Sequence, residues 1–267
     1  MKRILFLIST TVIFLSCKEN EKIIVNKISE KKDIIVEKDI NSKEPNSNSD
    51  STKTIDLGYY DTFEKLPKLT FEKINESEFN FLQSKKFIEK LKLEQNKNFF
   101  YVQTAIQKHK FEKYMDYGGN ESWNGYEFLG YYPKLKLFAL TESSTAKNLE
   151  FGELFLLDSI SDYKYNIISF GDGSVELPIP SISNKYLVYY YNYVYQQKNC
   201  DIGVLKINDK SNPKNYLTEY SSSHSDEFAI EKIIWKSDNC FYVKGYEEIY
   251  INDEWIKRYK YYKTEFK

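Results

Sequence analysis

The sequence predicts a mainly β fold, an antiparallel meander with one or two short helices near the start of the domain. Aromatic residues make up 17% of the 267 residues, with 24 Tyr and 18 Phe against 10 Gly and 6 Pro. Aromatic side chains pack well on pleated sheets. After Asn98 the apolar residues form short runs separated by polar turns, which is typical of strands.

The amino-terminal segment has the pattern of a secretory signal peptide. Lys2 and Arg3 precede residues 4–15, which carry no charge, and the small residue Ser16 follows. Twelve residues as a helix would span about 18 Å, too short for a hydrocarbon core about 30 Å thick. We therefore predict a signal peptide over residues 1–16. The alternative is a short membrane anchor or a buried strand.

Residues 14–17, Phe-Leu-Ser-Cys, resemble the lipobox of bacterial lipoproteins, although Phe14 departs from the Leu, Val or Ile usual there. The resemblance implies that the chain is cut after Ser16 and that Cys17 is acylated on its sulfur and its new amino group. Two or more acyl chains anchor a protein stably, because each buried methylene contributes about 0.8 kcal/mol. The implied partner is a membrane, reached through the lipid anchor at Cys17.

Residues 18–55 hold eight Lys, eight Asp or Glu and no aromatic residue. Such a segment buries too little apolar area to offset its ordering entropy. We predict that residues 17–55 comprise the lipidated Cys17 and a flexible tether, and that residues 56–267 form a tyrosine-rich β domain. Residues 18–21, Lys-Glu-Asn-Glu, resemble a signal that moves some Gram-negative lipoproteins to the cell surface. The expected location is the outer membrane, with surface exposure or ordinary linker composition left open.

Within the domain, apolar residues spaced three or four apart predict one or two short helices over residues 77–93. Three segments, opening near residues 132, 179 and 234, each begin with strand, polar turn and strand, and two more strands follow. This rhythm, with a period of about 50 residues, resembles β-propeller blades. The turn at Asn184 resembles one that is common in secreted propellers. The alternative is a meander or sandwich without radial symmetry.

Four tyrosines alternate in one predicted strand: Tyr189, Tyr191, Tyr193 and Tyr195. A period of two places all four rings on one face of a sheet. They form either an aromatic binding face for a sugar or protein or cross-strand packing inside the domain, which we favour.

Two cysteines remain once Cys17 is lipidated, Cys200 and Cys240. An exported protein permits a disulfide between them. The alternative is two small buried side chains, and sequence alone does not place their Cα atoms close enough for a bond.

Motifs for chemistry are absent from the sequence. Two His, His109 and His224, are too few for a metal site of the His or Cys type, and no phosphate loop, dinucleotide fingerprint or nucleophile elbow occurs. We predict no catalytic residue, metal or cofactor. His109 is interpreted as solvated and residues 222–226 as a polar loop. Residues 170–174 are interpreted as a tight turn whose glycines adopt positive φ.

The charge balance disfavours nucleic acid as a partner. Removing Lys2 and Arg3 from the 38 basic residues leaves 36 against 39 acidic residues, so the mature charge is −3. We expect a membrane-anchored envelope lipoprotein that binds an envelope protein, a glycan or a peptide. The alternative is a secreted hydrolase that uses paired carboxylates, as glycosidases do.

Overall fold

The computed structural model describes residues 53–115, 123–146, 149–193 and 198–266. All of them belong to one structural unit, Ser49–Lys267. Cys17, the signal segment and Tyr195 lie outside the described residues. The predicted fold class is confirmed, because the described chain is mainly β, with antiparallel sheets and two short α-helices. The first strand begins at Thr54, two residues before the predicted start of the domain.

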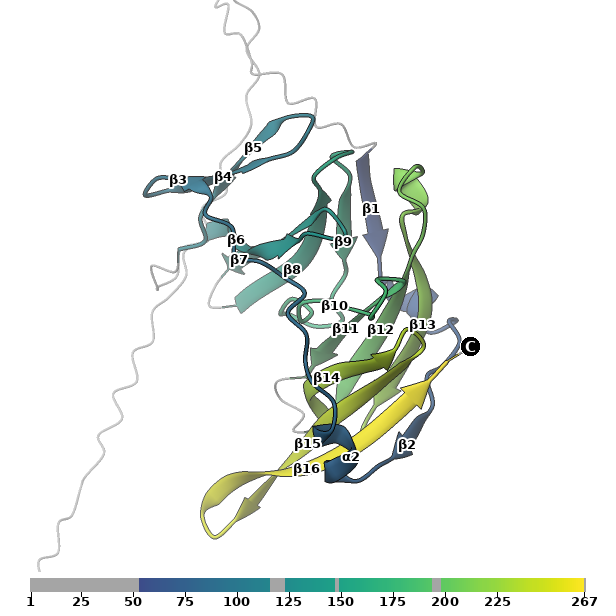
Figure 1. Cartoon of the computed structure of the whole chain (residues 1–267). Coiled ribbons are helices and arrows are strands. Elements are labelled where there is room, and N and C mark those ends of the chain that lie inside the picture. Colours follow the sequence, from purple (N-terminus) through teal and green to yellow (C-terminus); the bar gives the residue numbers. More distant parts are fainter. Residues whose placement is uncertain (1–52, 116–122, 147–148, 194–197, 267) are drawn as a thin grey trace, which may run out of the picture. The chain divides into compact units, whose positions relative to one another are not determined.

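Sheet A has the strand order β1-β9-β8-β7-β6 (Figure 1). Its strands are β1 (Thr54–Leu57), β6 (Trp123–Tyr132), β7 (Leu137–Ala146), β8 (Leu149–Asp158) and β9 (Lys164–Ile167). Strands β6 to β9 form an antiparallel meander, and β1 pairs with β9 in parallel.

Sheets B, C and D are antiparallel, with the orders β10-β11-β12-β13, β14-β15-β16-β2 and β3-β4-β5. Sheet B consists of β10 (Ile179–Pro180), β11 (Tyr186–Asn192), β12 (Cys200–Ile207) and β13 (Leu217–Ser225). Sheet C consists of β14 (Ala229–Ser237), β15 (Cys240–Ile251), β16 (Glu254–Glu265) and β2 (Phe71–Lys73). Sheet D consists of β3 (Glu94–Gln95), β4 (Phe99–Gln103) and β5 (Lys108–Glu112).

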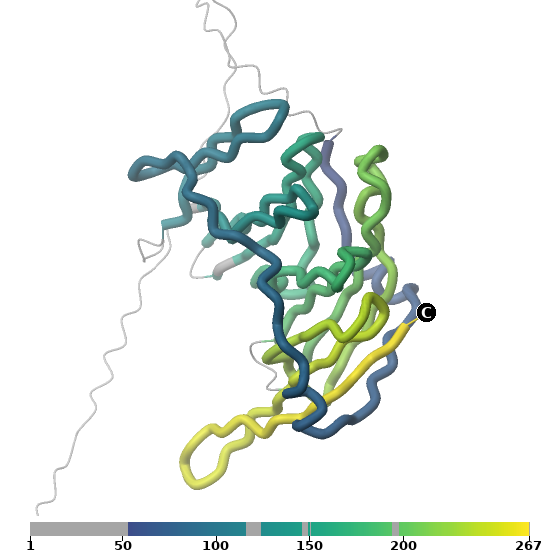
Figure 2. The backbone as a smooth tube through the Cα atoms, in the orientation of Figure 1, coloured from purple at the N-terminus to yellow at the C-terminus, as the bar shows by residue number. Residues whose placement is uncertain are grey.

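The three predicted repeats correspond to sheets A, B and C, but the described residues form no closed propeller. The third repeat differs from its prediction. Residues 247–251 continue β15 instead of forming a separate strand, because Gly245 makes no turn but pairs with Lys260 of β16 and leaves room for the ring of Phe228. The fourth strand is β2, so an early segment lies beside the last strand (Figure 2). The predicted turn at Asn184 is present, with φ of 57°.

The helices are shorter than the sequence pattern suggests. They are α1 (Tyr60–Phe63), α2 (Glu76–Asn80) and a 3₁₀ turn η2 (Pro213–Asn215). Asn75 caps α2 by accepting a hydrogen bond from the N–H of Glu78. Residues 83–93 are not helical as predicted, because their apolar side chains pack on different elements: Phe87 stacks on Tyr132 of β6.

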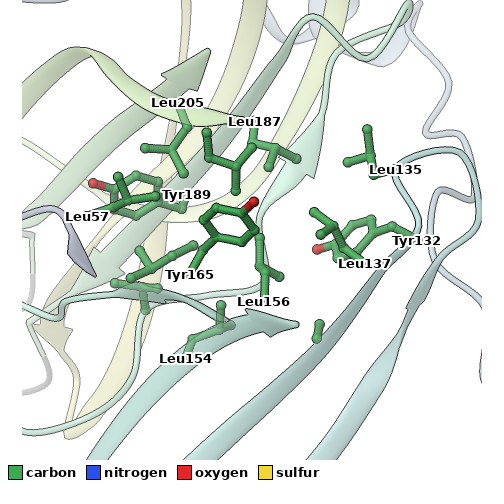
Figure 3. Packing of buried hydrophobic residues seen from close by; sticks show 14 of the residues in the cluster. Leu57, Tyr132, Leu135, Leu137, Leu154, Leu156, Tyr165, Leu187, Tyr189 and Leu205 are labelled. Atoms are coloured by element: carbon green, nitrogen blue, oxygen red, sulfur yellow. The ribbon is translucent and has the colours of Figure 1, made fainter. Parts of the chain in front are cut away.

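The core lies in layers between the sheets. One cluster fills the space between sheets A and B (Figure 3), a second lies between B and C, and a third between A and D. Strand β11 is buried on both faces: Leu187 and Tyr189 contact the first cluster, and Val188 the second. Two tyrosines of the first layer have hydrogen-bond partners: Tyr132 donates to the carbonyl of Pro178 at 2.6 Å, and Tyr165 donates to that of Pro213 at 2.7 Å.

Candidate functional site

The predicted tyrosine face points into the layer between sheets A and B. Tyr189 is 2% exposed and Tyr191 is 8% exposed. A Cβ at Gly203, the residue opposite Tyr189, would lie 2.2 Å from the tyrosine ring. The ring therefore occupies the space that Gly203 leaves open, and packing accounts for Tyr189. Tyr191 and the half-buried Tyr193 are left to line a cavity.

That cavity is a cleft of about 880 Å³, here called the A/B cleft. Its lining includes residues of β6, β7 and β11, of the segment 171–177, and Tyr193 just after β11: Glu127, Leu129, Thr141, Ser143, Asp172, Ser174, Glu176, Tyr191 and Tyr193. The segment 171–177 joins the two sheets. Gly152 of β8 donates its N–H to the carbonyl of Asp172, and Glu176 donates to the carbonyl of Tyr190, both at 2.8 Å.

The glycines of the segment 170–174 serve a different purpose from the one predicted. Neither Gly171 nor Gly173 has a positive φ. A Cβ at Gly171 would instead lie 2.2 Å from the hydroxyl of Tyr191. Gly171 is thus required for the close approach of the tyrosine ring, and this contact places the segment at the rim of the cleft.

Thr141 is the most informative residue of the cleft. Its side chain is 7% exposed, and Oγ1 has no hydrogen-bond partner among the described residues. An unsatisfied buried hydroxyl costs about 1–3 kcal/mol. Thr141 stands opposite Glu127 across β6 and β7. Because Thr141 also lines the cleft, its hydroxyl is the candidate hydrogen-bonding group for a ligand there.

The charge of the A/B cleft is negative. Glu127, Asp172 and Glu176 line it, against Lys90, whose ammonium donates to the carbonyl of Leu129 at 2.5 Å. The hydroxyl of Tyr193 donates to Asp201 at 2.6 Å. Burial and this bond raise the pKa of Tyr193, so its phenol stays neutral.

A pair of glutamates lies beside the cleft. Glu142 and Glu153 are directly opposite each other on β7 and β8. They line a smaller hollow, which shares Gly152, Gly171 and Asp172 with the cleft.

The two glutamates have different surroundings. Glu142 accepts hydrogen bonds from Tyr126 at 2.9 Å and from Lys164 at 3.4 Å. Burial raises the pKa of Glu153, and the neighbouring charge of Glu142 adds to the rise, while Lys164 opposes it. Glu142 thus has two hydrogen-bond donors beside it, whereas burial biases Glu153 toward its protonated form.

A second cavity, of about 340 Å³, lies where β10 and β14 approach the end of β6. Exposed lysines surround its aromatic lining, among them Lys85, Lys134 and Lys232. No side-chain atom found both buried and unpartnered in the described residues lines it. The A/B cleft is therefore the better candidate site.

Both histidines differ from their predictions. His109 is not solvated, because its Nε2 lies 2.6 Å from Oδ1 of the buried Asp162. Residues 217–225 form strand β13 and not a loop. In that strand Nδ1 of His224 lies 2.8 Å from Oδ1 of Asp201, its partner on β12.

Cys200 and Cys240 are buried free thiols. Cys200 packs in the layer between sheets B and C, whereas Cys240 packs against Phe79 of α2 on the other face of sheet C. The two thiols thus lie on opposite faces of sheet C and are not bonded to each other in this structure. Burial raises the pKa of both thiols, which favours the unreactive protonated form.

Within the described ranges, no cluster of three or more His, Cys, Asp or Glu side chains could hold a metal ion. Neither helix there is long and apolar enough to cross a bilayer. Comparisons of the chain with protein-family models, curated proteins and solved structures find no match.

The sequence analysis missed most of the cleft residues. One signal was present. The face of residues 137–146 that carries Leu137 and Ala139 continues with Thr141 and Ser143. Along one face of a single strand, the side chains thus change from apolar to hydroxyl-bearing before the strand ends. Such a change indicates that this face meets a polar cavity.

Proposed function

We propose that this chain is a lipid-anchored envelope protein of the outer membrane, and that its β domain binds a glycan in the A/B cleft. The lipobox-like residues 14–17 support the anchor. The single observation that carries the binding proposal is the buried hydroxyl of Thr141, which lines the cleft without a hydrogen-bond partner among the described residues.

The chemistry of the cleft favours a sugar. Tyr191 and Tyr193 offer aromatic rings, and their centroids lie 5.1 Å apart at 85°. Hydroxyls and carboxylates surround these rings. A pyranose ring combines an apolar face with many hydroxyls, so it matches an aromatic surface edged by hydrogen-bonding groups.

The charge of the cleft narrows the class of glycan. Three carboxylates and one ammonium line it, so an anionic sugar would meet repulsion, while an amine-bearing sugar would be attracted. We expect amine-bearing oligosaccharides to bind best, neutral ones less tightly and sulfated ones least.

Calorimetric titration of the full chain in detergent with deacetylated, N-acetylated and sulfated oligosaccharides tests this order. Thr141→Val should weaken binding about tenfold, since one lost hydrogen bond of about 1.4 kcal/mol has that effect. Thr264→Val is the matched control, because Thr264 also carries a buried hydroxyl without a partner but does not line the cleft. Preferred binding of the sulfated sugar, or equal losses in both variants, would contradict the proposal.

A second candidate function is glycoside hydrolysis by Glu142 and Glu153. Directly opposite side chains begin about 4.5–5.5 Å apart, similar to the separation of the two carboxyl groups in retaining glycosidases. Glu153, with its raised pKa, would donate the proton, and Glu142 would attack. Release of shortened sugars that ceases in both Glu142→Gln and Glu153→Gln would favour this function over simple binding.

A further inference from the structure

The hairpin of β15 and β16 extends beyond the rest of sheet C (Figures 1 and 2). Strand β14 pairs with β15 only as far as Tyr246, and β2 pairs with β16 only at Tyr262–Thr264. Between these limits β15 and β16 have only each other as strand partners among the described residues. The hairpin tip is a two-residue turn, Asn252 and Asp253, and both residues have positive φ.

This part of the hairpin exposes large apolar side chains. Tyr250 and Trp255 are each 57% exposed, and their rings contact each other at 5.2 Å. Ile251, Ile256 and Tyr259 are more than 40% exposed. A concentration of apolar surface on a projecting element is typical of a contact surface.

One edge of the hairpin also carries backbone groups ready for pairing. Ile251 and Glu254 close the turn as a hydrogen-bonded pair, so every second residue of β16 points its N–H and C=O away from β15. The carbonyl of Tyr261 confirms this alternation, because it accepts from the N–H of Ile74. The same alternation directs the groups of Trp255, Lys257 and Tyr259 outward, where no described residue meets them.

The charges of the side chains distinguish the two free edges, that of β15 and that of β16, as surfaces for pairing with a second copy. The free edge of β15 begins with Glu247 and Glu248 and holds no basic residue, so it offers no opposite charge to a second copy of itself. The free edge of β16 runs from Glu254 to Lys260 and carries an acid at one end and bases toward the other.

We propose that two copies of this chain associate through this edge, in antiparallel register about a two-fold axis at Lys257. Glu254 then faces Lys260 of the second copy, and Trp255 faces its Tyr259. All three outward-pointing residues form hydrogen-bonded pairs, each exchanging both bonds. A register moved by one pair loses bonds in either direction, because it places Tyr259 opposite the turn or Trp255 opposite Tyr261, whose carbonyl already accepts from Ile74.

At the axis, Lys257 of one copy faces Lys257 of the other. In each chain an aromatic ring lies beside the ammonium of Lys257 and a glutamate lies opposite this residue on β15. Its ammonium lies 3.9 Å from the centroid of the Tyr246 ring. Glu248 is its direct partner on β15. The association is isologous, since the same edge serves both copies.

Cysteine cross-linking of the full chain in detergent tests the register. In Lys257→Cys the two new thiols lie on the axis, with Cα atoms about 5.5 Å apart, within reach of a disulfide. In Trp255→Cys the matched thiols lie about 14 Å apart, because each residue faces Tyr259 of the other copy. We expect at least ten times more disulfide-linked dimer from Lys257→Cys under mild oxidation.

Size-exclusion chromatography with light scattering measures the molar mass of the chain in detergent and so tests the dimer without new thiols. The wild-type chain should have twice its monomer mass, and Lys257→Pro should weaken the dimer at least tenfold. The Lys257 N–H points away from β15, so the hairpin keeps its own bonds. A monomeric wild type, or equal cross-linking of both cysteine variants, would overturn the proposal. If Lys257→Pro fails to fold, the cysteine comparison decides alone.

Discussion

At the scale of single residues, close contacts between tyrosines and glycines shape the region around the cleft. The Tyr189 ring lies over Gly203, and the Tyr191 ring lies against Gly171. These contacts explain why a strand so rich in tyrosine is buried. Of the described tyrosines on this face, Tyr191 and Tyr193 line the cavity, while Tyr189 serves packing.

The contact between Gly203 and Tyr189 gives a prediction about stability. Gly203→Ala should lower the free energy of unfolding by about 2–3 kcal/mol, because the added methyl must displace a fully buried ring. Gly173→Ala is the matched control, since a Cβ there meets only one ring atom, at 3.8 Å. Urea unfolding measures both variants. Equal effects of the two substitutions would show that the ring is not held in this place.

At the scale of elements, carboxylates connect neighbouring sheets through their turns. Asp162, in the turn between β8 and β9, accepts hydrogen bonds from Thr104 and Gln107 and contacts His109, all of which belong to sheet D or its loop. In the turn after β14, Asp238 accepts from the N–H of Ser183 in the turn of sheet B. Such contacts fix the order of the layers.

Asp162 gives a prediction about pH. Burial alone would raise its pKa, but hydrogen bonds from His109, Thr104 and Gln107 outweigh burial and lower it. The stabilisation is therefore complete above the ordinary value of 3.8 and is lost as the pH falls through the lower folded value.

Asp162→Asn tests this linkage, because asparagine keeps the shape and tolerates the observed φ of 68°. The variant should lose about 1.5–3 kcal/mol at pH 7, and its difference from the wild type should shrink below pH 3.8. Urea unfolding at several pH values measures both. Asp209→Asn, at an exposed carboxylate in a local turn, should change little. A difference that persists in acid would contradict the assignment.

Element boundaries also show what sequence reasoning could reach. The three repeats were predicted to open near residues 132, 179 and 234 with strand, turn and strand, and turns are present there between β6 and β7, between β10 and β11, and between β14 and β15. The pairing of β2 with β16 was not predictable from the sequence. Phe71 and Thr264 are distant in the chain and become neighbours only in the folded structure. Residues 83–93 had a helical spacing, yet contacts such as that of Phe87 with Tyr132 determine their path.

The cleft was harder to predict, for the same reason. Tyr191 and Tyr193 were recognised, but Asp172 and Glu176 reach the cleft through a connecting segment whose position depends on both sheets. The pairing of His224 with Asp201 likewise requires the register of β12 and β13. Such neighbours are far apart in the sequence, whereas the periodicity of apolar residues and the turn residues predict only local structure.

At the scale of the whole molecule, we propose a lipid anchor at Cys17 and a glycan-binding cleft in the β domain. The predicted flexible tether, residues 18–55, lies between them in the sequence. The proposed edge pairing would place two clefts on one membrane-bound unit. Two linked sites raise the apparent affinity for a repetitive polysaccharide.

One measurement tests the combined claim most directly: the partition of a fluorescent amine-bearing oligosaccharide between the membrane pellet and the supernatant of cells that produce the chain. Wild-type cells should carry the label in the pellet, Cys17→Ala should move both protein and label to the supernatant, and Thr141→Val should leave the protein in the pellet without most of the label. Label that stays in the pellet with Cys17→Ala, or that follows Thr141→Val undiminished, would contradict the account.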